Sequence, residues 1–170
     1  MHLSVDLFPR DPSLEAFVNH WSRGYRDADR DASLYEPNIL KDLETERLAL
    51  WPLFEWKNGT RLSDAKRETV RINYVERWKL EQNLEQCYLD PAQPGHRAVW
   101  NIFYLHCRRP DVYPIYDQHT YRAMRYMTKQ SIAEIPGAQA QVYATYSIYR
   151  GFVDQLSASL QTMMRETPSA

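Results

Sequence analysis

The sequence predicts an all-α protein that folds as a single domain of about seven helices over residues 1–170. Hydrophobic residues recur at helical spacings of three and four, and no segment shows the alternation of a half-buried strand. The chain has 170 residues, of which 44% are hydrophobic, and this is enough for one core but hardly for two. We therefore expect one helical domain rather than a pair.

The first third of the chain is predicted to hold two helices. Asp11 and Pro12 form an N-cap and a first helical position, and the apolar stripe behind them consists of Leu14, Phe17, Val18, Trp21 and Tyr25. Pro37 is expected to open a second helix, which Pro52 ends or kinks. The apolar residues of this second helix are Leu40, Leu43 and Leu50.

The middle third is predicted to begin with a turn over residues 55–60, in which Gly59 follows Asn58 and supplies a positive φ. Ser63 then caps a helix. The residues expected to be buried along this helix and its continuation are Val70, Tyr74, Trp78, Leu84, Cys87 and Tyr88. Residues 90–95, which include Asp-Pro and Pro-Gly, are expected to break the chain.

The last third is predicted to hold three helices. The first is short and very apolar and ends at residues 108–110; it carries Val99, Trp100, Ile102, Phe103 and Leu105. The second begins near Pro114 and Asp117 and carries Met124 and Met127. The third follows Pro136 and has a heptad-like stripe that could form the seam of a homodimer: Val142, Tyr146, Tyr149, Val153, Leu156, Leu160 and Met163.

Composition excludes several functional classes. Five glycines argue against a P-loop or a Rossmann domain, because both need glycines where the backbone meets phosphate. Two cysteines, Cys87 and Cys107, are too few for a disulfide scaffold, a four-thiolate iron–sulfur cluster or a cysteine-based zinc site. Neither a signal peptide nor an apolar run of about 20 residues is present. We expect a soluble cytoplasmic protein without a cofactor.

Charge is distributed unevenly. Residues 1–56 hold six Lys/Arg against eleven Asp/Glu, whereas residues 57–170 hold fifteen against eleven. One surface could therefore face a polyanion, although ordinary solvated faces explain the same counts. A metal site is a weaker alternative, because its candidate ligands include no pair at i, i+4. These candidates are His96, His106, Asp111, Asp117 and His119.

Residues 94–126 are the most informative stretch of the chain. They predict a Pro-Gly turn, a buried helix, a basic loop bounded by proline, and Asp117 at the start of a second helix. A carboxylate at this position is stabilised by the free N–H groups of the helix. Asp117 is thus either a simple N-cap or a carboxylate held in place for chemistry.

This stretch resembles the core of the helix-hairpin-helix/Gly-Pro-Asp DNA glycosylase superfamily, the group of endonuclease III and 8-oxoguanine glycosylase. The hallmark is a Leu-Pro-Gly-Val-Gly hairpin, an apolar helix, a loop and Val-Asp-Thr-His, followed by an aromatic residue and arginine. Pro94 and Gly95 match the hairpin. Counting forward without a gap, Asp117 matches the catalytic aspartate, His119 the histidine, and Tyr121 with Arg122 the aromatic-arginine pair.

The resemblance covers about a fifth of the chain, and two departures from it matter. The second hairpin glycine is missing, so the hairpin is degenerate: Gly95 is followed by His96 and Arg97. The position of the Schiff-base lysine found in bifunctional members is Val99, and without that amine no imine can form there. The iron–sulfur loop that some members carry is also absent.

The resemblance implies a monofunctional glycosylase that removes a damaged or modified base from double-stranded DNA. Asp117 would stabilise the oxocarbenium ion and activate water. The flipped base would lie among aromatic faces, for which the candidates are Trp100, Tyr104, Tyr116 and Tyr121. The residues expected to contact DNA are Gly95, His96, Arg97, Arg108, Arg109, His119, Arg122 and Arg125.

Three alternatives remain open at the level of sequence. A second basic cluster could add phosphate contacts but fits a solvated helix face better; its residues are Lys57, Arg61, Lys66, Arg67 and Arg71. A domain with the same fold could bind nucleic acid or protein without catalysis, and a helical assembly protein could dimerise through the final helix. For the enzyme, Asp117→Asn is expected to remove catalysis while costing about 1 kcal/mol or less of stability.

Overall fold

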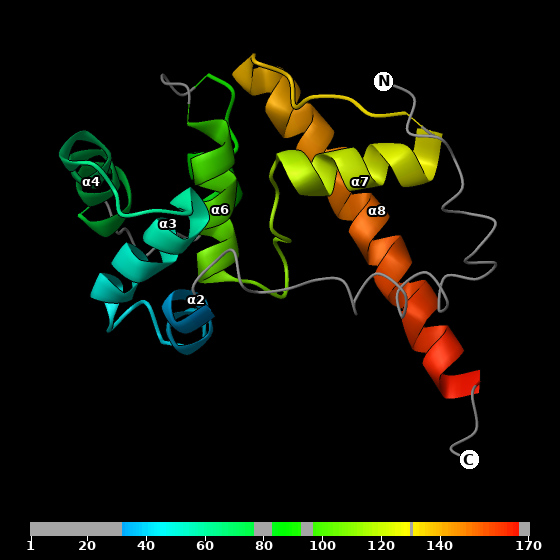
Figure 1. Ribbon diagram of the computed structural model, residues 1–170, viewed down its shortest axis with the longest axis horizontal. Helices are drawn as coiled ribbons and strands as arrows, with labels where there is room; N and C mark the ends of the chain where they lie inside the picture. The colour runs from blue at the N-terminus through cyan, green and yellow to red at the C-terminus, as the bar shows by residue number, and fades with distance from the viewer. Residues whose placement is uncertain (1–31, 77–82, 93–96, 130, 167–170) are drawn as a thin grey trace.

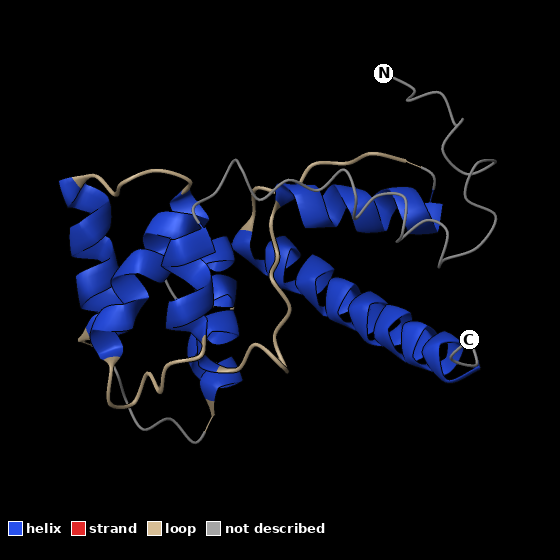
Figure 2. Ribbon diagram, turned by 60° about the horizontal axis from the view of Figure 1, so that its bottom comes forward, coloured by secondary structure: helices blue, strands red, loops and turns tan. Residues whose placement is uncertain are grey.

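The computed structural model describes residues 32–76, 83–92, 97–129 and 131–166, without the side chains of 163, 164 and 166. Within these ranges the chain forms helices and no strand, which confirms the all-α prediction (Figure 2). The elements are α2 (Ala32–Ile39), η2 (Arg47–Ala49), α3 (Leu50–Asn58), α4 (Asp64–Val70), the π-helical turn η3 (Arg71–Val75), α5 (Leu84–Tyr88), α6 (Ala98–Arg108), α7 (Gln118–Lys129) and α8 (Gln139–Glu166).

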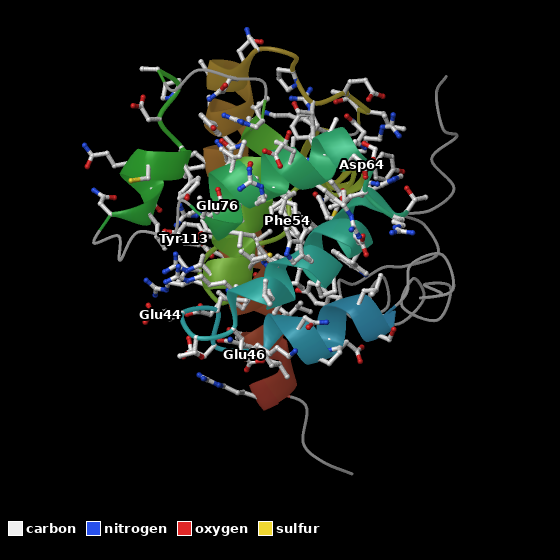
Figure 3. All side chains as sticks on the ribbon, turned by 90° about the vertical axis from the view of Figure 1, so that its left-hand side faces the viewer. Glu44, Glu46, Phe54, Asp64, Glu76 and Tyr113 are labelled. Carbon is white, nitrogen blue, oxygen red and sulfur yellow. The ribbon has the colours of Figure 1, made fainter. Side chains whose placement is uncertain are left out.

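Helix α6 lies in the middle of the fold, with α3 and α4 on one side, α2 below its lower end, and α7 and α8 on the other side (Figure 1). Its residues from Ile102 to Cys107 are all buried. One face of α6 joins the core of α2 to α5, in which Phe54 packs at 4.9 Å from Tyr74 and 5.3 Å from Phe103, ring centre to ring centre. Phe54 lies in the middle of these helices in Figure 3.

The other face of α6 joins a second core formed with α7 and α8. Ala98 and Ile102 contribute from α6, and the remaining buried residues are Tyr116, Tyr121, Met124, Val142, Tyr143, Tyr146 and Tyr149. A polar chain connects the two cores, because Asn101 on α6 accepts from the Tyr74 hydroxyl at 2.7 Å and donates to the Tyr143 hydroxyl at 3.0 Å. Helix α6 therefore serves two cores at once.

Several predicted elements are confirmed. Ser63 caps α4 and accepts from the Lys66 N–H, and Gly59 has φ 75° at the end of α3. Helix α6 ends at Arg108 as expected. On α8 the stripe is buried at Val142, Tyr146 and Tyr149 and partly buried at Val153, Leu156 and Leu160, and the homodimer seam stays a prediction.

The predicted helix from Pro37 to Pro52 is wrong. Pro37 lies inside α2, and the chain leaves the helix at Ile39. Asp42 forms a local turn instead, in which its carboxylate accepts from the Glu44 N–H and the Thr45 hydroxyl; such local bonds compete with a helix. Leu40 is consequently 86% exposed.

Two smaller predictions in this half are also wrong. Residues 55–58 belong to α3, which starts at Leu50. The helix tolerates Pro52 because an N–H in the first helical turn has no partner there. Cys87 is exposed rather than buried. The predicted helix over 11–25, Trp78 and the Pro94–Gly95 hairpin lie outside the described residues.

Candidate functional site

Asp117 caps the N-terminal end of α7. Its Oδ1 accepts from the backbone N–H groups of His119 and Thr120 at 2.9 and 3.0 Å. In return, the Thr120 hydroxyl oxygen accepts from the Asp117 N–H at 2.9 Å. The predicted position of Asp117 is confirmed, and its local sequence, with a hydroxyl three residues on, explains it.

The other carboxylate oxygen of Asp117 faces Lys57, which reaches it from α3. Lys57 Nζ lies 3.2 Å from Asp117 Oδ2 and donates to the Tyr116 carbonyl at 3.2 Å. The two side chains are 6% and 18% exposed, and the ammonium lies 5.6 Å from the centre of the Phe103 ring. This largely buried ion pair joins the two sides of the fold beside α6.

Sequence reasoning missed this pair and grouped Lys57 with the second basic cluster. Three other members of that cluster contact residues nearby in the chain: Lys66 contacts Asn58, Arg67 pairs with Glu55, and Arg71 pairs with Glu68 and Glu76. Lys57 and Asp117 are 60 residues apart, and no local pattern joins them.

The electrostatics of Asp117 favour its ionised form. Burial raises the pKa of this carboxyl. The Lys57 ammonium and the hydrogen bonds from Thr120 and His119 lower it by more than burial raises it, so the pKa lies below its usual value. Tyr149 lies beside Asp117 and hydrogen-bonds Thr120. Burial raises the pKa of the Tyr149 hydroxyl. Asp117 is thus a fixed negative charge at neutral pH.

A second buried titratable residue, His106, lies on α6. Its Nδ1 is 2.7 Å from the Tyr113 carbonyl, which can only accept, so Nδ1 carries the proton and Nε2 accepts from the Tyr35 hydroxyl at 2.6 Å. Burial lowers the pKa of the ring, and the nearby Lys57 lowers it as well. The hydrogen bond to the Tyr113 carbonyl raises the pKa, but by less, so the pKa lies below its usual value. His106 is therefore a neutral link between α2 and the loop after α6.

The loop after α7 is held against that helix by side chains of α7 itself. The Gln118 amide donates to the Ala133 carbonyl at 3.1 Å and accepts from the Ile135 N–H at 2.9 Å. Arg122 pairs with Glu134, and Arg125 donates to the Ser131 hydroxyl at 3.3 Å. Arg122 and Arg125, which were predicted to contact DNA, therefore face this loop.

The predicted cations do not gather at one place. Arg108 and Arg109 lie at the C-terminal end of α6, and Arg108 is nearly buried against Tyr104. Arg122 and Arg125 lie on α7, His119 is exposed at its start, and Arg97 precedes α6. Gly95 and His96 lie outside the described residues.

The predicted base-stacking aromatics are packed inside the fold. Tyr104 and Tyr116 have no exposed surface, Tyr121 is buried, and Trp100 packs on Phe54. Tyr104 belongs to the core of α2 to α5, whereas Tyr116 and Tyr121 belong to that of α7 and α8. The structure therefore brings only Tyr116 and Tyr121 close to Asp117.

In the part of the chain that the structure describes, no group of three or more His, Cys, Asp or Glu could hold a metal ion. No described helix is long and apolar enough to span a membrane. Comparisons of the chain with protein-family models, with curated proteins and with solved structures find no match.

Proposed function

We propose that this chain binds double-stranded DNA and acts as a monofunctional glycosylase that releases a damaged or modified base. The observation that carries the proposal is the ionised Asp117 at the start of α7, a helix that holds Arg122, Arg125 and Lys129 and no acidic residue. The order of α6, a proline-bounded loop, Asp117 and α7 supports the resemblance to the glycosylase superfamily.

In this proposal Asp117 acts mainly through its charge. Cleavage of the bond between base and deoxyribose builds positive charge on the sugar, and a fixed carboxylate stabilises that charge. The lowered pKa makes Asp117 a weak base, so it orients the attacking water more than it takes its proton. Because Val99 occupies the lysine position of bifunctional enzymes, the product is an intact abasic strand.

The second candidate is a domain that binds nucleic acid or protein without catalysis, and the Lys57–Asp117 ion pair favours it. The ammonium offsets the charge that would stabilise an oxocarbenium ion. Capping of α7 and pairing with Lys57 also account for Asp117 without a substrate. The burial of Tyr104, Tyr116 and Tyr121 fits packing roles.

The decisive experiment compares Lys57→Met with Lys57→Met/Asp117→Asn. Both variants lack the ammonium, so they differ only in the carboxylate, and neither leaves a buried lysine unpaired. Base release is measured from a panel of duplexes, each with one damaged or modified base. We expect release by the double variant to be on the order of 100- to 1000-fold slower, with strands nicked only after alkali.

DNA affinity is measured alongside, for wild type, for Arg122→Glu/Arg125→Glu and for a control of equal charge change, Arg47→Glu/Arg165→Glu. No base release by wild type, or equal release by the two Lys57 variants, rules out catalysis by Asp117. If catalysis is ruled out and Arg122→Glu/Arg125→Glu loses salt-dependent DNA affinity while the control variant keeps it, the non-catalytic DNA-binding candidate stands. If wild type does not bind DNA at all, both DNA proposals fail.

A further inference from the structure

A cavity of about 260 Å³ lies at the C-terminal end of α6, among the end of α2, the loop after it and the start of α5. Its lining residues are Ile39, Lys41, Asp42, Leu43, Glu44, Leu84, Cys107, Arg108, Arg109 and Pro110. A dry cavity of about 150 Å³ can hold benzene. This cavity therefore has room for a six-membered ring with a charged substituent.

One side of the cavity is apolar and the other carries three cations. Ile39, Leu43, Leu84 and Cys107 give it an apolar wall, and burial raises the pKa of the Cys107 thiol, which keeps that residue neutral. Lys41, Arg108 and Arg109 supply positive charge. A ligand that matches both sides has an apolar ring and an anionic group.

Arg108 is the best-positioned of these cations. Its side chain is only 9% exposed, and its guanidinium donates to the Tyr104 hydroxyl at 3.2 Å and lies 5.9 Å from the centre of that ring. A guanidinium fixed in this way loses little conformational entropy when it binds a carboxylate or phosphate.

The carboxylates near the cations leave room for such an anion. Glu44 lies 3.9 Å from Arg108, which is longer than a hydrogen bond, and its side chain is 58% exposed. It belongs to the surface loop after α2 (Figure 3). Asp42 is engaged in its own turn, where it accepts from the Glu44 N–H and the Thr45 hydroxyl. Lys41 lies 3.6 Å from Glu46 and Arg109 lies 3.9 Å from Asp111, and both pairs are exposed, so each contributes little energy. An incoming anion therefore competes with Glu44 at Arg108, with Glu46 at Lys41 and with Asp111 at Arg109.

We propose that this cavity binds a small organic anion, a six-membered ring that bears a carboxylate or a phosphate. The ring lies against Leu43, Leu84 and Cys107, and the anionic group binds Arg108 with Lys41 and Arg109 at the rim. Asp117 belongs to a different part of the fold, beside Lys57 and α7, so this binding site does not include the proposed catalytic carboxylate.

The test titrates the ¹⁵N-labelled full chain with benzoate and with phenyl phosphate and follows backbone amide shifts. Benzyl alcohol serves as the uncharged ring and inorganic phosphate as the anion without a ring. We expect saturable shifts confined to residues 39–44, 84 and 107–109 for the two organic anions. Binding of the alcohol and of inorganic phosphate should be at least 10-fold weaker.

Two variants add evidence in opposite directions. Glu44→Gln removes the carboxylate that competes at Arg108, so affinity should rise several-fold. Glu36→Gln changes an exposed carboxylate of α2 outside the cavity and should leave affinity unchanged. Lys41→Met/Arg109→Met keeps Arg108 in place and should weaken binding about 10-fold. Absence of saturable shifts, equal binding of benzyl alcohol, or unaltered affinity in Glu44→Gln and Lys41→Met/Arg109→Met would overturn the proposal.

Discussion

At the scale of single residues, the ion pair between Lys57 and Asp117 has the largest consequences. It alters the expectation that Asp117→Asn is nearly harmless to stability. Asparagine can still cap α7 through its side-chain oxygen, but it removes the negative charge opposite the ammonium of Lys57, whose side chain is only 6% exposed. An unpaired charge at such a site is costly.

We therefore predict that Asp117→Asn lowers the free energy of unfolding substantially, toward the lower end of roughly 3–5 kcal/mol because Asp117 keeps some solvent contact. Lys57→Met should cost less, since the carboxylate keeps its two backbone hydrogen bonds. Urea unfolding of both single variants and of the double variant measures the coupling. We expect it to be about 1–3 kcal/mol, and strictly additive losses would contradict a direct interaction.

His106 predicts how stability depends on pH. Its pKa is lowered in the fold, so below about 6.5 the unfolded chain takes up a proton that the folded chain does not. Stability contributed by neutral His106 is therefore present above this pH and is lost as pH falls toward the folded-state pKa, at no more than about 1.4 kcal/mol per pH unit.

The measurement is urea unfolding of wild type, His106→Gln and His119→Gln at pH 7.5, 6.5 and 5.5. The pH dependence should be smaller in His106→Gln. His119 is exposed at the start of α7, so its variant should behave as wild type. If all three proteins lose stability in parallel, His106 is not the group responsible.

At the scale of helices, two glycines predict opposite effects of one substitution. Gly151 lies in the middle of α8, where an alanine Cβ would meet no atom of another element within 4 Å, whereas Gly59 ends α3 at φ 75°. Gly151→Ala should raise the free energy of unfolding by about 0.5–1 kcal/mol. Gly59→Ala should lower it by about 1 kcal/mol, and Gly59→Asn by less, since asparagine tolerates this conformation.

Chemical denaturation of these three variants checks the prediction. A change of the same sign for both alanine variants would mean that backbone conformation at these positions does not control stability. The comparison also separates α8 from α3, because each substitution acts on its own helix.

At the scale of the whole molecule, features with a local cause could be predicted from the sequence. Helix α6 follows from its apolar run before Arg108, and the start of α7 follows from Asp117 and Thr120. The end of α2 could not be found, because Pro37 is tolerated inside that helix while the Asp42 turn stops it.

The candidate site was predictable only in part for a similar reason. The cap at Asp117 is encoded within four residues, but its partner Lys57 comes from α3 and depends on the packing of both helices against α6. Tyr149 reaches the same place from α8. Contacts of this kind have no signature in the spacing of residues along the chain.

The burial of every residue from Ile102 to Cys107 limits which changes of chain length the fold can accept. Inserting one residue into α6 turns everything beyond it by about 100° about the helix axis. Both cores pack on this helix, Tyr104 in the core of α2 to α5 and Ile102 in that of α7 and α8. A one-residue insertion before Ile102 would therefore displace both side chains from their neighbours, and both cores would lose their packing. Length variation is thus confined to the loops that flank this helix.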